Sequence, residues 1–234
     1  MKNNPIVLGD GVVIGLSTVA DGDMRVYNKE GAELERVRAN IAKFLKRAGF
    51  SVDRSVLVKL DYSTDDFRKY SRVNASDAGR GISDTGSVDA HDALATAEKD
   101  LGLFLPLADC LGAVIFDPEH QVLMVSHLGR HSIEQNGGAE SVKYLMREFG
   151  SLPGRLLIWL SPSAGKENYP LIKLGGQSIR EAVIEQLVGA GVDAENISGD
   201  DIDTTVSPDY YSYSQAQKTG KDLNKRFAIV AKIV

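Results

Sequence analysis

A cysteine and a histidine at the open end of an expected hairpin are the strongest candidates for chemistry in this chain. Cys110 lies directly before an apolar run at 111–116, and His127 lies directly after a second run at 122–126. The two runs are joined by Asp-Pro-Glu-His, in which Pro and Asp are turn formers. If the runs pair as a hairpin, the side chains of Cys110 and His127 become neighbours.

Such a pair has three interpretations. A cysteine thiolate beside an imidazole can act as a nucleophile with its base, or the two side chains can form half of a metal site. A free cysteine is also among the most buried residue types, so the third interpretation is inert packing. Cys110 is the single cysteine of the chain, which excludes an internal disulfide and suits a reducing compartment. The N-terminal segment has no signal-peptide pattern, and we expect a cytoplasmic protein.

Further polar residues flank this pair. His131 follows His127 by four residues and would share a helical face with it, but the glycines nearby favour a loop. In a loop, Arg130 and His131 could instead bind an anion such as phosphate. Asp61 follows a short apolar run at 56–60, where a carboxylate either caps a turn or serves as an oxygen ligand to a metal.

The apolar pattern predicts the elements that position these residues. Helical periodicity is expected at 34–48, 138–149 and 178–189, and buried strands at 56–60, 101–107, 111–116, 122–126, 156–160 and 227–234. A polar stretch at 71–92 is expected to form a long loop. Strands and helices are interspersed without regular βαβ alternation, so we expect a mixed α+β fold of layered sheets and helices, in one domain over 1–234.

The composition excludes several function classes. The chain has 234 residues, a formal net charge of -5 and 43% hydrophobic residues, as in an ordinary soluble globular protein. No basic cluster is present, which argues against a nucleic-acid partner. No apolar stretch is long enough to span a bilayer. The expected partner is a small polar molecule, and the chain is expected to be a monomer or a homodimer.

Five segments resemble the motifs of one family in order and spacing. Residues 107–112 resemble its T-A-D-C-x-P, 92–96 its D-A-L-V-T, and 127–132 its H-A-G-W-R-G. Residues 161–164 resemble its G-P-S-I, and 204–221 its C-T…F-F-S-Y-R-R…T-G-R tail. The chain therefore resembles the laccase-domain (multi-copper polyphenol oxidoreductase, YfiH-like) family over nearly its whole length.

The resemblance implies a layered α/β fold and a mononuclear zinc held by two histidines and a cysteine, with copper as the alternative metal. Cys110 and His127 match the second and third ligands. The first ligand lies in the family's Q-V-H-G, matched here by 59–62, which puts Asp61 in place of the histidine; His91 is the alternative. The catalytic candidates implied are Cys110, His127, Asp109, Arg130 and His131.

The family is credited with phosphorolysis of purine nucleosides, adenosine deamination and copper-dependent phenol oxidation. The leading expectation is zinc-dependent phosphorolysis or deamination of a purine nucleoside. Because the family's tail arginines are replaced by Ser214, Gln215 and Lys221, phosphorolysis is expected to be weak. The alternatives are a metal-free cysteine hydrolase that uses Cys110 and His127, and a non-catalytic binding protein.

Overall fold

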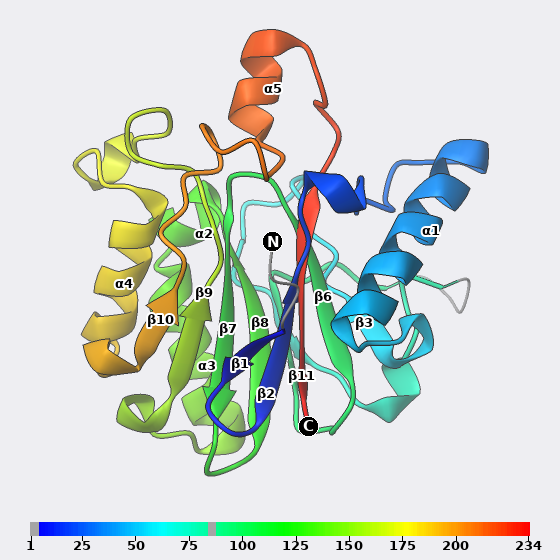
Figure 1. Cartoon of the computed structure of the whole chain (residues 1–234). Coiled ribbons are helices and arrows are strands. Elements are labelled where there is room, and N and C mark those ends of the chain that lie inside the picture. Colours follow the sequence, from blue (N-terminus) through cyan, green and yellow to red (C-terminus); the bar gives the residue numbers. More distant parts are fainter. Residues whose placement is uncertain (1–4, 84–87) are drawn as a thin grey trace.

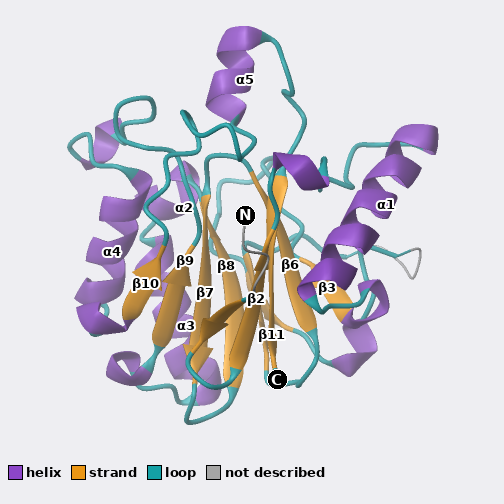
Figure 2. Cartoon of the chain, viewed as in Figure 1, coloured by secondary structure: helices purple, strands orange, loops and turns teal. Residues whose placement is uncertain are grey.

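The computed structural model describes residues 5–83 and 88–234. Its strands form two sheets packed face to face, with helices on both outer faces (Figures 1 and 2). This is the mixed, layered α/β architecture that the sequence predicts. In the part of the chain that is described, no helix is both long enough and apolar enough to cross a membrane.

The first sheet combines strands from both ends of the described chain. Its order is β1 (Ile6–Leu8), β2 (Val12–Leu16), β11 (Phe227–Ile233), β6 (Gly102–Leu107) and β3 (Ser55–Leu57). The strand β11 pairs antiparallel with both β2 and β6 and so lies in the middle of this sheet.

The second sheet is built around the expected hairpin. Its order is β10 (Ile197–Gly199), β9 (Leu157–Leu160), β7 (Leu111–Asp117), β8 (Val122–Leu128), β5 (Ala93–Thr96) and β4 (Tyr70–Arg72). The strands β7 and β8 pair antiparallel over their full length.

Five α-helices and several single 3-10 turns complete the described residues. The helices are α1 (Gly31–Ala48), α2 (Arg130–Glu134), α3 (Gly137–Phe149), α4 (Ile179–Gly189) and α5 (Tyr213–Thr219). The 3-10 turns are η1 (Val19–Asp21), η2 (Val52–Arg54), η3 (Ala75–Asp77), η4 (Pro153–Arg155), η5 (Ile172–Leu174) and η6 (Ala194–Asn196).

Three apolar clusters fill the space between the layers. Both faces of the central strands are therefore covered. Along β7, Val114 and Phe116 point into the cluster between the two sheets. Ala113 and Ile115 alternate with them and pack under α2, α3 and α4. The helix α1 covers the other sheet through its buried apolar face, against β6 and β11. Both sheets are therefore rigid, and their ends can position side chains accurately.

Most predicted elements are present, with four corrections. The strand expected at 56–60 ends at Leu57, and Lys59 makes only an isolated bridge. The loop expected at 71–92 contains the end of β4 and the turn η3, while 84–87 lies outside the described residues. The loop expected after His127 is the helix α2, because Gly129 forms its N-cap. The strands β1, β2, β5 and β10 and the helix α5 were not expected from the sequence.

Candidate functional site

A cavity of about 410 Å³ lies at one end of the two sheets, where β6 passes into β7. It contains Cys110 and His127 together with three arginines and five aromatic rings. Its lining residues include Arg25, Tyr27, Tyr62, Phe67, Asp109, Cys110, His127, Arg130, His131, Tyr169, Tyr213, Asn224 and Arg226. These residues come from segments that lie far apart along the chain, so the cavity forms only when the chain folds.

The hairpin brings Cys110 and His127 to one point of the cavity. Gly112 of β7 pairs with His127 of β8, so His127 lies inside the strand and Cys110 lies just before the strand opposite. A Cβ on Gly129 would lie 2.9 Å from Cys110 Sγ and 3.3 Å from His127 Nε2. Both side chains therefore surround the same small volume, which only a glycine at 129 leaves open.

Burial fixes the protonation of this pair at neutral pH. It raises the pKa of the Cys110 thiol to about 12, and the neighbouring Asp109 carboxylate raises it further. Burial also lowers the pKa of His127 to about 4, with an added contribution from the charge of Arg226. A neutral thiol beside a neutral imidazole is the opposite of the thiolate–imidazolium pair that a cysteine hydrolase uses.

Asp109 reaches the cavity wall, but its carboxylate is occupied. Oδ1 accepts a hydrogen bond from Thr204 Oγ1 at 2.9 Å, and Oδ2 accepts from the backbone N–H and the hydroxyl of Ser214 at 2.6 and 2.7 Å. The residue has φ 75°, which Asp tolerates better than most residues. Asp109 therefore positions the start of α5 over the cavity.

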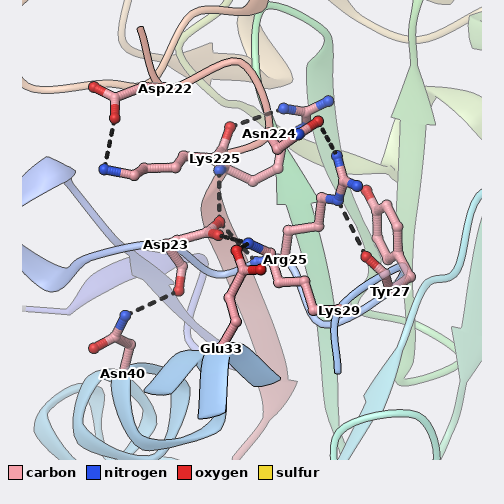
Figure 3. A network of polar contacts seen from close by, with 10 residues as sticks. Asp23, Arg25, Tyr27, Lys29, Glu33, Asn40, Asp222, Asn224 and Lys225 are labelled. Carbon is pink, nitrogen blue, oxygen red and sulfur yellow. Dashed lines mark hydrogen bonds and ion pairs between the residues drawn. The ribbon is translucent and has the colours of Figure 1, made fainter. Parts of the chain in front are cut away.

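Arg25 and Arg226 are two cavity arginines that sequence reasoning missed. The carboxylate of buried Asp23 accepts the backbone N–H of Arg25 at 3.1 Å and that of Arg226 at 2.9 Å. The guanidinium of Arg25 also donates to Asn224 Oδ1 and to the carbonyl of Tyr27 (Figure 3). Asp23 thus holds two residues from opposite ends of the chain side by side.

Arg226 has a further anchor and a local sequence signal. Its guanidinium donates to the carbonyl of Lys225 at 2.8 Å and lies over the ring of Tyr213, 5.5 Å from the centroid. It stands directly before β11. The last arginine of the family's tail motif was matched to Lys221, which lies earlier in the chain. Lys221 does not line the cavity. The tail therefore supplies the cavity with an arginine that the motif match did not include.

Arg130 and His131 line the cavity from the first turn of α2. The ring of His131 stacks on Phe67, with 4.8 Å between centroids. His127 lies in a strand and His131 in a helix, so the two histidines do not share a helical face. His131 therefore contributes to the aromatic wall of the cavity.

The family assignment rests on the sequence as well as on this geometry. The model of the family described as multi-copper polyphenol oxidoreductase laccase matches residues 15–183, a range that includes both Cys110 and His127. The chain belongs to this laccase family.

Two similar proteins carry a functional name. The chain is 27% identical over 158 residues to a purine nucleoside phosphorylase of Corynebacterium glutamicum, covering 59% of this chain and 63% of that protein. It is 28% identical over 141 residues to the purine nucleoside phosphorylase YlmD of Bacillus subtilis, covering 60% and 48%. The matched segments thus span less than two-thirds of either relative.

Two solved structures with similar folds confirm the fold. A YlmD structure from Geobacillus stearothermophilus superposes with a TM-score of 0.82 at 18% identity, covering 96% of this chain and 92% of that one. A hypothetical protein YfiH of Bacillus licheniformis gives a TM-score of 0.81 at 17% identity, covering 95% and 93%. At these identities the likeness shows the fold alone.

The laccase-family chain does not assemble the expected three-ligand metal group. The Oδ1 atom of Asp61 accepts hydrogen bonds from the backbone and hydroxyl of Ser63, and Asp61 does not line the cavity. His91 is directed to the carbonyl of Asp89 instead. Among the described residues, no three His, Cys, Asp or Glu side chains are placed to hold a metal ion.

Two donors are too few for a catalytic zinc, which takes three protein ligands and an open position. A thiol and an imidazole have the right chemistry for zinc or copper, but their number does not fit. The predictions that Asp61, or His91 in its place, joins Cys110 and His127 are therefore corrected.

Asp92 gives this region a pH dependence that can be measured. Burial raises the pKa of Asp92 to about 6, although its carboxylate accepts the Lys69 N–H. The unfolded chain releases this proton near pH 4, so the contribution of Asp92 to the free energy of unfolding should fall as pH rises from 4 to 7. Asp92→Asn should remove this loss. The free energy of unfolding of the variant should therefore rise relative to that of wild type by about 2–3 kcal/mol between pH 4 and pH 7.

Urea unfolding of both proteins at pH 4, 5, 6 and 7 measures the difference. Asp200→Asn is a matched control, because Asp200 is exposed. A difference between Asp92→Asn and wild type that stays constant over this range would contradict the assignment.

Proposed function

We propose that this chain is an enzyme that cleaves a purine nucleoside with phosphate in the cavity around Cys110 and His127. The observation that carries the proposal is the combination of Arg25 and Arg226 with five aromatic rings in one cavity of about 410 Å³. Aromatic rings bind a purine by stacking, and guanidinium groups bind phosphate with paired hydrogen bonds. The phosphorylase names of two relatives support the same substrate class.

The charges of the cavity suit a doubly charged anion. Asp109 is the acidic residue among the lining residues, and its carboxylate is occupied by Thr204 and Ser214. Arg25 and Arg226 are tied by their backbones to Asp23, so their positions are fixed before the anion arrives. Preorganised cations of this kind hold phosphate and its developing transition-state charge without reorganisation.

In the proposed reaction a phosphate oxygen attacks C1′ of the sugar. The bond between C1′ and that oxygen forms while the bond between C1′ and the purine nitrogen breaks. The proton that hydrogen phosphate loses ends on the departing base, so the products are free base and ribose 1-phosphate. His127 is neutral and buried, and it lies where it can hydrogen-bond a substrate without adding charge.

The pKa of Cys110 speaks against the cysteine hydrolase. A thiol whose pKa is raised to about 12 carries almost no thiolate at neutral pH, and the thiolate is the nucleophile in such enzymes. A product assay distinguishes the remaining possibilities. Phosphorolysis gives free base and ribose 1-phosphate, deamination gives ammonia, and binding alone gives no product.

The test is a product assay with adenosine, inosine and guanosine, each with and without phosphate. We expect free base only in the presence of phosphate, with an equal amount of ribose 1-phosphate. Lys221→Ala should react like wild type, because Lys221 is exposed and does not line the cavity. Ammonia release from adenosine without phosphate would replace phosphorolysis by deamination. Nucleoside binding without any product would reject the enzymatic proposal.

A further inference from the structure

Tyr62 faces the volume that Cys110 and His127 enclose. The ring of Tyr62 meets the ring of His127 edge-on, with 6.3 Å between centroids. Leu60 and Tyr62 line the cavity, whereas Asp61 between them does not. Tyr62 and Ser63 lie in a bend, which turns the side chain of Tyr62 into the cavity and leaves that of Asp61 outside it. Position 62 is therefore the place in this segment from which a third donor could reach the pair.

Asp61 cannot take that role without leaving its own hydrogen bonds. Its Oδ1 accepts from the Ser63 N–H at 2.8 Å and from the Ser63 hydroxyl at 2.6 Å. These bonds lower the pKa of Asp61 and hold its carboxylate on the side of the chain away from the cavity. In this geometry Tyr62, and not Asp61, lies on the cavity wall beside His127.

We propose that Tyr62 fills the place of the missing third metal ligand, so that this chain does not retain zinc at Cys110 and His127. Zinc sites in proteins use Cys, His, Asp and Glu as ligands and not Tyr, and the remaining Cys110 and His127 supply two of the three ligands that a catalytic zinc requires. The substitution of one residue then decides the metal content of the cavity. This inference does not depend on which substrate the cavity binds.

The experiment compares wild type with Tyr62→His and with the matched variant Asp61→His. Each protein is stripped of metal, loaded with Zn²⁺, dialysed, and analysed for zinc per chain. We expect about one zinc per chain for Tyr62→His, as in a three-ligand site, and no stoichiometric zinc for wild type or Asp61→His. Adding Cys110→Ser to Tyr62→His should remove the zinc.

A spectroscopic readout identifies the ligands. With Co²⁺ in place of zinc, Tyr62→His should show the visible absorption of tetrahedral cobalt and a thiolate-to-cobalt charge-transfer band that depends on Cys110. Tyr62 is 60% exposed, so its substitution should leave the thermal unfolding of the protein nearly unchanged.

Two results would overturn the proposal. One is a wild-type protein that retains one zinc per chain and loses it in Cys110→Ser. The other is a folded Tyr62→His that retains no more zinc than Asp61→His does. The first measurement needs no variant at position 62, so it decides the proposal even where Tyr62→His does not fold. Neither result depends on base release, so failure here is distinct from failure of the proposed phosphorolysis.

Discussion

Arg226→Ala is expected to lower kcat/KM for phosphate by about a hundredfold to a thousandfold in the proposed phosphorolysis. Arg226 presents a planar donor to the cavity and is fixed by Asp23, Lys225 and the ring of Tyr213. Alanine keeps the backbone N–H that Asp23 accepts, so the substitution removes the guanidinium without releasing the strand. Steady-state kinetics at varied phosphate and fixed nucleoside measures the effect.

The size of the loss should depend on the shape of the cation as well as its charge. Arg226→Lys keeps one positive charge but loses the two-pronged hydrogen bonding, so an intermediate loss is expected. The melting temperature gives a second readout. Phosphate should raise the melting temperature of wild type more than that of Arg226→Ala, because it stabilises the protein that binds it more tightly. Unchanged KM and kcat for phosphate in Arg226→Ala would remove this residue from the anion site.

Asp109→Ala is expected to lower the free energy of unfolding by about 3–5 kcal/mol. The carboxylate is buried and accepts from Thr204 and from both the N–H and the hydroxyl of Ser214. Its removal leaves these donors without a partner, and alanine also adopts φ 75° less readily than aspartate. Equilibrium unfolding in urea measures the loss.

A local readout separates this role from a general loss of packing. Hydrogen exchange should rise most at 204–219, the segment that Asp109 holds over the cavity. Asp109→Asn keeps one carbonyl oxygen and tolerates the same backbone conformation, so it should lose less stability than alanine. A loss below about 1 kcal/mol for Asp109→Ala would show that these hydrogen bonds contribute little.

The hairpin was predictable because its information is local. Two apolar runs and a short turn determine the pairing of β7 with β8, and the pairing brings Cys110 near His127. The layered architecture followed from the same apolar runs, since strands that are buried on both faces need cover on both sides. The strand β10 was missed because it is short and partly exposed.

The rest of the site depends on information that a local pattern does not contain. Asp61 and Tyr62 lie at a bend beyond the end of β3, where no periodic pattern tells which side chain enters the cavity. Arg25 and Arg226 become neighbours through the buried carboxylate of Asp23. No spacing in the sequence predicts a contact between loops that lie at opposite ends of the chain.

The central place of β11 in its sheet has a consequence for synthesis on the ribosome. The strands β2 and β6 each pair with β11, and both are made long before it. Until residues 227–233 emerge, these two apolar strands present unpaired edges to other nascent chains and to chaperones. Arg226 arrives together with β11, so the cavity acquires this arginine only in the step that closes the sheet.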